Sequence, residues 1–176
     1  MQSILVAYIC CKIFKIPISI FMKEISSYKG LPFRSSIIYN SKTKIVINDS
    51  KATNINASIS NLKNKKNVFL IIGGIAKENN FKKFNRFDNE ISQMYIYGKS
   101  RFLINKQLKL RKPPKIFDKL SNLIDSILKD SSLSKNKATI LFAPACASFD
   151  QFASYQDRGK YFNKLIRSKL KNYEHF

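Results

Sequence analysis

The strongest constraint on the fold is a set of short apolar runs that alternate with segments of helical pattern. The run NVFLIIGG at 67–74 is apolar at every position before its two glycines, which is typical of a parallel strand buried on both faces. Further strand-like runs lie at 43–48, 93–98 and 137–144. Because strands and helices alternate along the chain, the pattern predicts an α/β fold with a mostly parallel sheet flanked by helices.

The segments between these runs supply the remaining elements. The expected elements are a strand at 35–40 and helices at 54–63, 113–130 and 148–172. Apolar residues recur at helical spacing through 113–130, so that helix has one apolar face. Ser50 or Thr53 is a candidate cap for the helix that follows them.

The N-terminal segment 4–22 is almost entirely apolar and raises the alternative of a membrane anchor. Lys12, Lys15 and Pro17 interrupt it, and no small-residue cleavage site follows. Its apolar positions 5, 6, 9, 13 and 16 fit one face of a helix. We therefore expect a pair of helices broken near Pro17 and no membrane span.

Composition limits the partners and the compartment. The net charge of +21 predicts attraction to any polyanion, yet the sequence has no long lysine block and no aromatic RNA-binding signature. A basic nucleic-acid-binding protein is thus an alternative, without a specific nucleic acid expected. Cys10, Cys11 and Cys146 leave an odd thiol, and His175 is the single histidine, which argues against a structural metal site and favours a reducing cytoplasm.

Chemistry-bearing residues follow three of the predicted strands. Asp49, Lys51 and Thr53 follow the first, Lys77 the second and Ser148 the third. In an α/β fold the carboxyl ends of the strands converge, so these loops predict one cationic crevice, with backbone amides that open the last helix completing an anion site. Such a site suits a small dicarboxylate or a phosphate. No histidine is available to activate Ser148 as a nucleophile.

Each of these residues also has a simpler interpretation. Ser50 and Thr53 are the types that cap helices, and exposed lysines such as Lys51 and Lys77 are usually solvated charges. The double glycine before Lys77 is weak support for a phosphate site, because nucleotide-binding fingerprints need wider spacing. Taken singly, the residues do not identify a reaction.

Four motifs together resemble the C-terminal half of the Mur ligase family, in particular its D-glutamate-adding branch. They are GLPFR (30–34), INDSKATN (47–54), IIGGIAK (71–77) and APACASFDQFASYQDRG (143–159). The resemblance implies that 31–176 is a Rossmann-like C-terminal domain that binds D-glutamate. It implies equally that 1–30 holds the last helices of the central ATPase domain, and that the source is a bacterium.

The resemblance also implies a reaction and a set of site residues. ATP would activate the carboxylate of UDP-N-acetylmuramoyl-L-alanine as an acyl phosphate, which D-glutamate then attacks. Lys51 and Lys77 would be catalytic. The D-glutamate-binding set would be Thr53, Lys77, Ser148, Phe149 and Tyr155, and the ATP-binding set Arg34, Asp49 and Lys51. Mg²⁺ would accompany ATP, with its ligands upstream.

The sequence departs from the family pattern in ways that bear on activity. Ser3 and Phe33 stand where the resemblance implies an asparagine and a histidine, and no G-x-x-x-x-G-K-[ST] loop is present. We therefore expect the latter half of a ligase that is inactive without an N-terminal half, with an exposed and self-associating apolar face at 4–22. A non-catalytic amino-acid-binding module and a gene relic are the alternatives.

Overall fold

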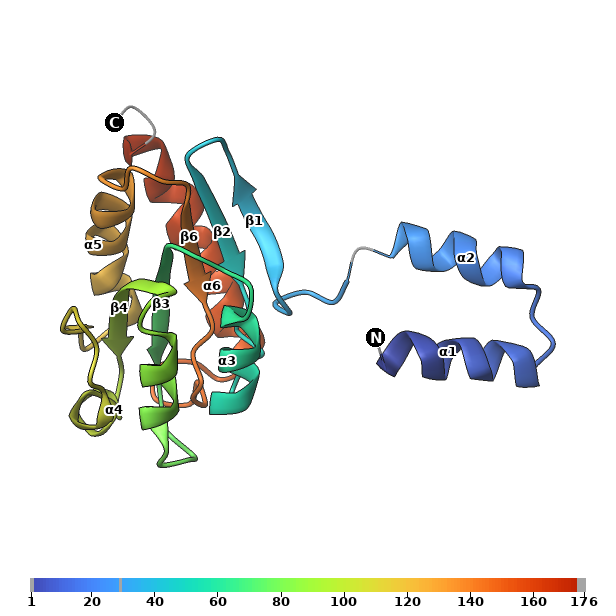
Figure 1. Cartoon of the computed structure of the whole chain (residues 1–176), viewed down its shortest axis with the longest axis horizontal. Coiled ribbons are helices and arrows are strands. Elements are labelled where there is room, and N and C mark those ends of the chain that lie inside the picture. Colours follow the sequence, from blue (N-terminus) through green and yellow to red (C-terminus); the bar gives the residue numbers. More distant parts are fainter. Residues whose placement is uncertain (1, 29, 174–176) are drawn as a thin grey trace. The chain divides into compact units, whose positions relative to one another are not determined.

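The computed structural model describes residues 2–28 and 30–173, with the backbone alone for residues 2 and 3 (Figure 1). The expectations for the Ser3 side chain and for His175 lie outside these described residues. The chain forms two compact units, Met1–Leu31 and Pro32–Phe176, and each is described by itself.

The first unit is a pair of helices, α1 (Gln2–Ile13) and α2 (Ile18–Ser27). The expected break is confirmed, because Pro17 directly precedes α2 and its ring fixes φ at −57°. The Tyr8 and Phe21 rings join the two helices, with their centroids 5.5 Å apart. Most apolar side chains of the pair are exposed, and no described helix is both long and apolar enough to span a bilayer.

The second unit is built on a six-stranded sheet in the order β1-β2-β6-β3-β4-β5. The strands are β1 (Ser36–Asn40), β2 (Lys44–Asn48), β3 (Val68–Gly73), β4 (Ile91–Tyr97), β5 (Lys115–Ile116) and β6 (Ala138–Phe142). Only β1 pairs antiparallel, against β2; all other neighbours are parallel. The predicted α/β class with a mostly parallel sheet is therefore confirmed.

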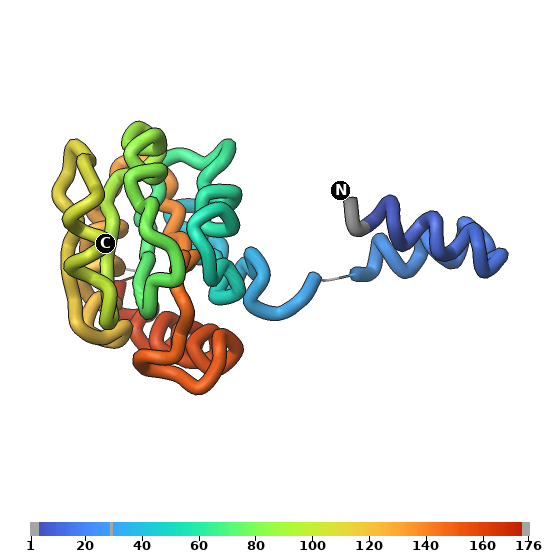
Figure 2. The backbone as a smooth tube through the Cα atoms, turned by 90° about the horizontal axis from the view of Figure 1, so that it is seen from below, coloured from blue at the N-terminus to red at the C-terminus, as the bar shows by residue number. Residues whose placement is uncertain are grey.

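Helices cover both faces of this sheet, as Figure 2 shows for α3 and α6. One layer holds α3 (Ile55–Leu62), the 3₁₀ helix η1 (Phe81–Phe87) and α4 (Arg101–Gln107); the other holds α5 (Leu120–Ser132), α6 (Tyr155–Lys169) and the 3₁₀ helix η2 (Leu170–Tyr173). The register aligns Val46 with Ile140 and Ile140 with Phe69, and all three are buried against the α5–α6 layer. Alternate strand residues such as Leu70 are buried against the α3–α4 layer.

Several element boundaries differ from the sequence-based expectation. The helix expected at 113–130 begins at Leu120, because Pro113 and Pro114 favour extended backbone and the next two residues form β5. The cap of α3 is Asn54, whose side chain accepts a hydrogen bond from the backbone N–H of Ala57, rather than Ser50 or Thr53.

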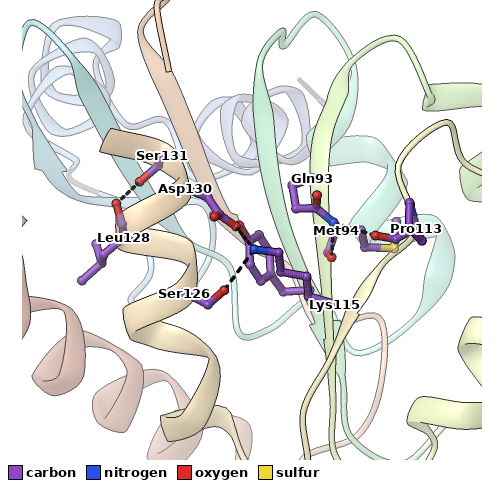
Figure 3. Close-up of polar contacts among 9 residues, drawn as sticks. Gln93, Met94, Pro113, Lys115, Ser126, Leu128, Asp130 and Ser131 are labelled. Carbon is purple, nitrogen blue, oxygen red and sulfur yellow. Dashed lines mark hydrogen bonds and ion pairs between the residues drawn. The ribbon is translucent and has the colours of Figure 1, made fainter. Parts of the chain in front are cut away.

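The two-residue edge strand β5 is tied to α5 through a polar network (Figure 3). The Lys115 Nζ atom lies 2.7 Å from the Asp130 carboxylate and 3.4 Å from the Ser126 hydroxyl. The Tyr95 hydroxyl, from the neighbouring strand β4, donates to the same carboxylate. One carboxylate of α5 therefore holds two adjacent strands at this edge of the sheet.

Candidate functional site

The loops that follow β2, β6 and β3 converge at the carboxyl edge of the sheet, because these three strands are neighbours and parallel. Backbone hydrogen bonds join the loops directly. The Ala145 N–H donates to the Ala52 carbonyl at 2.8 Å, and Ile75 and Ala147 exchange two hydrogen bonds of 2.9 Å. The expected meeting of the three strand ends is thus present in the fold.

Two glycines make this close approach possible. Gly73 and Gly74 have φ values of +142° and +124°, in the region that favours glycine. A Cβ atom would lie 2.1 Å from the Tyr97 carbonyl oxygen at Gly73, and 2.1 Å from the Ala147 carbonyl oxygen at Gly74. The double glycine therefore lets β3 run between two neighbouring backbones, which is a structural role that needs no phosphate.

Asp49 is nearly buried, and its carboxylate is already oriented by two neighbours. The Asn61 amide of α3 donates to Asp49 Oδ2, and the Ser35 hydroxyl, which donates to the Asn61 side-chain oxygen at 2.6 Å, lies 3.2 Å from the same Oδ2. Asn61 is itself fixed by a 3.1 Å hydrogen bond to the Ala57 carbonyl. This arrangement holds the carboxylate in one direction, as a residue that accepts a ligand hydroxyl requires. Sequence reasoning missed Ser35 and Asn61 as partners of Asp49.

Lys51 and Tyr155 lie together at this edge. The Lys51 Nζ atom lies over the Tyr155 ring, 4.5 Å from its centroid. The Lys51 N–H donates to the Phe33 carbonyl at 3.0 Å, which brings the segment containing Arg34 to the same loop. Phe33 has φ of +60°, and its ring packs on Gly159, where a Cβ would lie 2.4 Å from the Phe33 Cδ1 atom.

The other predicted residues lie in the loops around Lys51 and Tyr155. Thr53 is half-buried and donates its N–H to the Lys51 carbonyl, while Ser148 is only 3% exposed. Phe149 is 66% exposed, and the side chains of Arg34 and Lys77 are also exposed. Lys77 lies two residues beyond Ile75 and Ser148 one beyond Ala147, so the paired loops bring both residues toward one edge.

Arg158 is a buried cation that sequence reasoning missed. It is 0% exposed, and it donates to Ser50 Oγ at 3.0 Å, to the Ser50 carbonyl at 2.8 Å and to the Cys146 carbonyl at 3.0 Å. These bonds join the loop after β2 to the loop after β6. A signal was present in the sequence, because Arg158 shares the four-residue spacing of Phe162 and Ile166 on the buried face of α6.

The helix N-terminus expected at Ser148 is not there. Residues 148–153 form turns in which Gln151 and Phe152 donate their N–H groups to the Ser148 carbonyl, and α6 begins at Tyr155. The Ser154 side chain accepts from the Asp157 N–H and donates to the Asp157 carboxylate. The first turn of α6 therefore already carries a cap and an acid, so its amides do not form the anion site expected beside Ser148.

Two buried side chains beside Arg158 remain neutral. Burial raises the pKa of the Tyr97 hydroxyl, an effect that the nearby Arg158 charge partly opposes. Burial likewise raises the pKa of the Cys146 thiol to about 12. A thiol protonated at neutral pH is a poor nucleophile, so the site offers no covalent chemistry through this cysteine.

The cationic and hydroxyl groups of this edge fit anionic ligands better than a metal ion. Within residues 2–28 and 30–173, no group of three or more histidine, cysteine, aspartate or glutamate side chains is arranged to hold a metal. The residues described here thus do not fit Mg²⁺ by themselves, and we assign no Mg²⁺ ligand among them.

Comparison with known proteins found curated relatives but no matching family model. The chain is similar to the UDP-N-acetylmuramoylalanine–D-glutamate ligase of Hydrogenobaculum sp., with 36% identity over 146 residues that cover 82% of this chain and 35% of the relative. It is also similar to the ligase of the same name from Rickettsia felis, with 31% identity over 167 residues that cover 94% of this chain and 37% of the relative. The ligase of the same name from Hydrogenovibrio crunogenus is 30% identical over 168 residues, covering 92% and 36%. The chain thus spans about a third of the length of these relatives.

A comparison of structures gives the same fold. The UDP-N-acetylmuramate–alanine ligase MurC of Thermotoga maritima matches 94% of this chain and 37% of its own with a TM-score of 0.63, at 15% sequence identity. Curated relatives from different bacteria share one name and cover most of the chain, and the fold agrees with that of a related ligase. The chain therefore belongs to the Mur ligase family and matches about a third of the length of its D-glutamate-adding members.

Proposed function

We propose that this chain binds D-glutamate and one side of ATP in a bacterial cytoplasmic ligase that joins D-glutamate to UDP-N-acetylmuramoyl-L-alanine. The observation that carries the proposal is the hydrogen-bonded convergence of the loops after β2, β3 and β6, which brings Lys51 and Lys77 to one edge of the sheet. Two ammonium groups at such an edge suit a dicarboxylate on one side and a phosphate on the other.

In this proposal D-glutamate lies between the loops after β3 and β6. The exposed Lys77 ammonium pairs with a carboxylate of the amino acid, and the Thr53 hydroxyl donates to the same carboxylate. Ser148, Phe149 and Tyr155 lie along the other end of the ligand. Tyr155 is already held under the Lys51 ammonium, so its ring offers a fixed wall.

The nucleotide lies on the β2 side of the same edge. Asp49 accepts a hydrogen bond from a ribose hydroxyl, because Asn61 donates to Oδ2 and fixes the direction of the carboxylate, with the Ser35 hydroxyl bound to Asn61 behind it. Arg34 contacts the phosphates, and Lys51 lies where the nucleotide and amino-acid sites meet. The oriented Asp49 carboxylate matches a ribose hydroxyl, and the cationic side chains of Arg34 and Lys51 match the phosphate groups of a nucleotide.

The chemistry proposed for the complete ligase is amide formation through an acyl phosphate. A substrate carboxylate oxygen attacks the terminal phosphate of ATP and releases ADP; the D-glutamate amine then attacks the acyl carbon and releases phosphate and a proton. Lys51 and Lys77 stabilise the charges of the phosphate and of D-glutamate. We propose that residues 1–30 belong to the ATP-hydrolysing central domain, that 31–176 are the D-glutamate-binding domain, and that Mg²⁺ ligands lie elsewhere in the ligase.

Titration of the isotopically labelled chain with D-glutamate, followed by nuclear magnetic resonance, tests the proposal directly. We expect shifts of the backbone amides of Thr53, Lys77 and Ser148 with D-glutamate and not with L-glutamate. Lys77→Ala should abolish these shifts, because it removes the charge that pairs with the carboxylate. Lys66→Ala, at another exposed lysine, is the matched control and should bind as the unaltered chain does.

The titration also separates the alternatives. Binding of D-glutamate without ATP-dependent shifts near Asp49 favours a non-catalytic amino-acid-binding module. Absence of any D-glutamate-dependent shift contradicts the proposal and favours a relic. Salt-sensitive DNA binding alone carries no weight for a chain with a net charge of +21, so only a sequence preference supports a nucleic-acid function.

A further inference from the structure

The loop that carries Lys77 is fixed on its N-terminal side by Ser100, the residue that precedes α4. The Ala76 N–H donates to the Ser100 hydroxyl at 2.9 Å. The Ser100 N–H donates in turn to the Gly74 carbonyl at 3.0 Å. Ser100 therefore binds the loop through both its backbone and its side chain, and the side-chain bond ends at Ala76, immediately before Lys77.

The C-terminal side of the same loop is fixed by Gln107, the last residue of α4. Its side-chain Nε2 donates to the Asn79 side-chain oxygen at 2.6 Å, and its side-chain Oε1 accepts from the Phe81 N–H at 3.0 Å. The amide also lies 3.4 Å from the Leu103 carbonyl one turn earlier on α4. The Gln107 side chain thus joins Asn79 of the loop and Phe81, the first residue of η1, to α4.

The two anchors leave a short segment between them. Lys77 and Glu78 lie between the fixed residues Ala76 and Asn79, are exposed, and make no hydrogen bond of their own to the part of the chain that the structure describes. Helix α4 is itself held in the core through Ile104, which is 0% exposed. The position of Lys77 is therefore set by the anchors rather than by contacts of Lys77.

We propose that Ser100 and Gln107 are positioning residues that hold Lys77 where it meets a carboxylate ligand. The inference rests on the proposed D-glutamate site for the role of Lys77, while the attachment of the loop to α4 is independent of it. Neither side chain needs to touch the ligand. The hydrogen bonds of Ser100 and Gln107 restrict the conformations of the loop that carries Lys77, so the loop loses less conformational entropy when an anionic ligand binds.

The binding arm of the test measures D-glutamate affinity of the whole chain by calorimetry. We expect Ser100→Ala and Gln107→Ala each to weaken D-glutamate binding about fivefold or more, the effect of one lost hydrogen bond of ordinary strength, and to leave ATP affinity unchanged. Ser100→Thr keeps the hydroxyl and should restore the affinity. The matched control is Ser60→Ala, an exposed serine of α3 whose side chain makes no hydrogen bond to a described residue.

The second arm measures amide hydrogen exchange over residues 74–81 and needs no ligand. We expect faster exchange there in Ser100→Ala and Gln107→Ala, with the rest of the sheet and the unfolding midpoint close to those of the unaltered chain. Unchanged exchange at 74–81 overturns the inference, and so does faster exchange with unaltered D-glutamate affinity. If the unaltered chain binds no D-glutamate, the proposed function fails, and the exchange arm still decides whether α4 holds the loop.

Discussion

Replacement of Arg158 by methionine should destabilise the second unit more than any exposed substitution. Methionine keeps an unbranched stem but removes the three hydrogen bonds to Ser50 Oγ and to the Ser50 and Cys146 carbonyls. The two carbonyls lie in a buried setting and lose a charged donor, and each such loss costs about 1–3 kcal/mol. We therefore expect the free energy of unfolding to fall by about 3–5 kcal/mol, of the total of about 5–15 kcal/mol that is usual for a domain.

Urea denaturation followed by circular dichroism measures this change, and thermal unfolding should show a midpoint lower by about 8–15 °C. Arg167→Met makes the same chemical change on the exposed face of the same helix and should cost less than about 0.5 kcal/mol. A loss of under about 1 kcal/mol in Arg158→Met would show that water or a shifted loop replaces the guanidinium. That result would refute the argument that Arg158 joins the two loops.

Three further outcomes follow from the packing. Gly159→Ala should lower the thermal midpoint and alter the amide resonances of the loop containing Phe33, since the new Cβ would meet that ring at 2.4 Å; unchanged resonances would contradict this packing. Tyr95→Phe should lower the free energy of unfolding in urea by about 1–2 kcal/mol, because Asp130 loses a donor; a neutral effect would contradict a role in holding the sheet edge. The buried Cys146 thiol should resist alkylation at pH 8 until the chain unfolds. The free energy of unfolding should decrease as pH rises from 9.0 toward about 12, because the thiol ionises in the unfolded chain before it ionises in the folded chain.

The sheet was predictable because its strands are buried on both faces and carry continuous apolar runs. The apolar runs around Leu70 and Leu141 are typical of central parallel strands, because both faces of such a strand are covered by helices. The segment 99–119 was not predictable in the same way. Its helix α4 has seven residues, of which Ile104 alone is buried, and its strand β5 has two residues, so neither produces a periodic pattern.

The sequence allowed us to predict which loops carry the residues of the candidate site, but not which side chains these residues contact. Position after a strand was enough to select Asp49 and Lys77. The amides that bind beside them come from helices, Asn61 of α3 to Asp49 and Gln107 of α4 to Asn79 in the loop of Lys77, and no local sequence pattern marks such an amide. The start of α6 was misplaced because the turn before Ser154 has the composition of a helix, while the cap itself decides the boundary.

The placement of β6 has a consequence for synthesis. This strand comes last in the chain but lies third in the sheet, where it is the sole link between β2 and β3. A nascent polypeptide that ends before residue 138 contains two separate sheet fragments, each with an open edge ready to pair with a neighbouring chain. The sheet is joined only when the final strand leaves the ribosome, so this unit should fold late and depend on chaperones that shield open strands during translation.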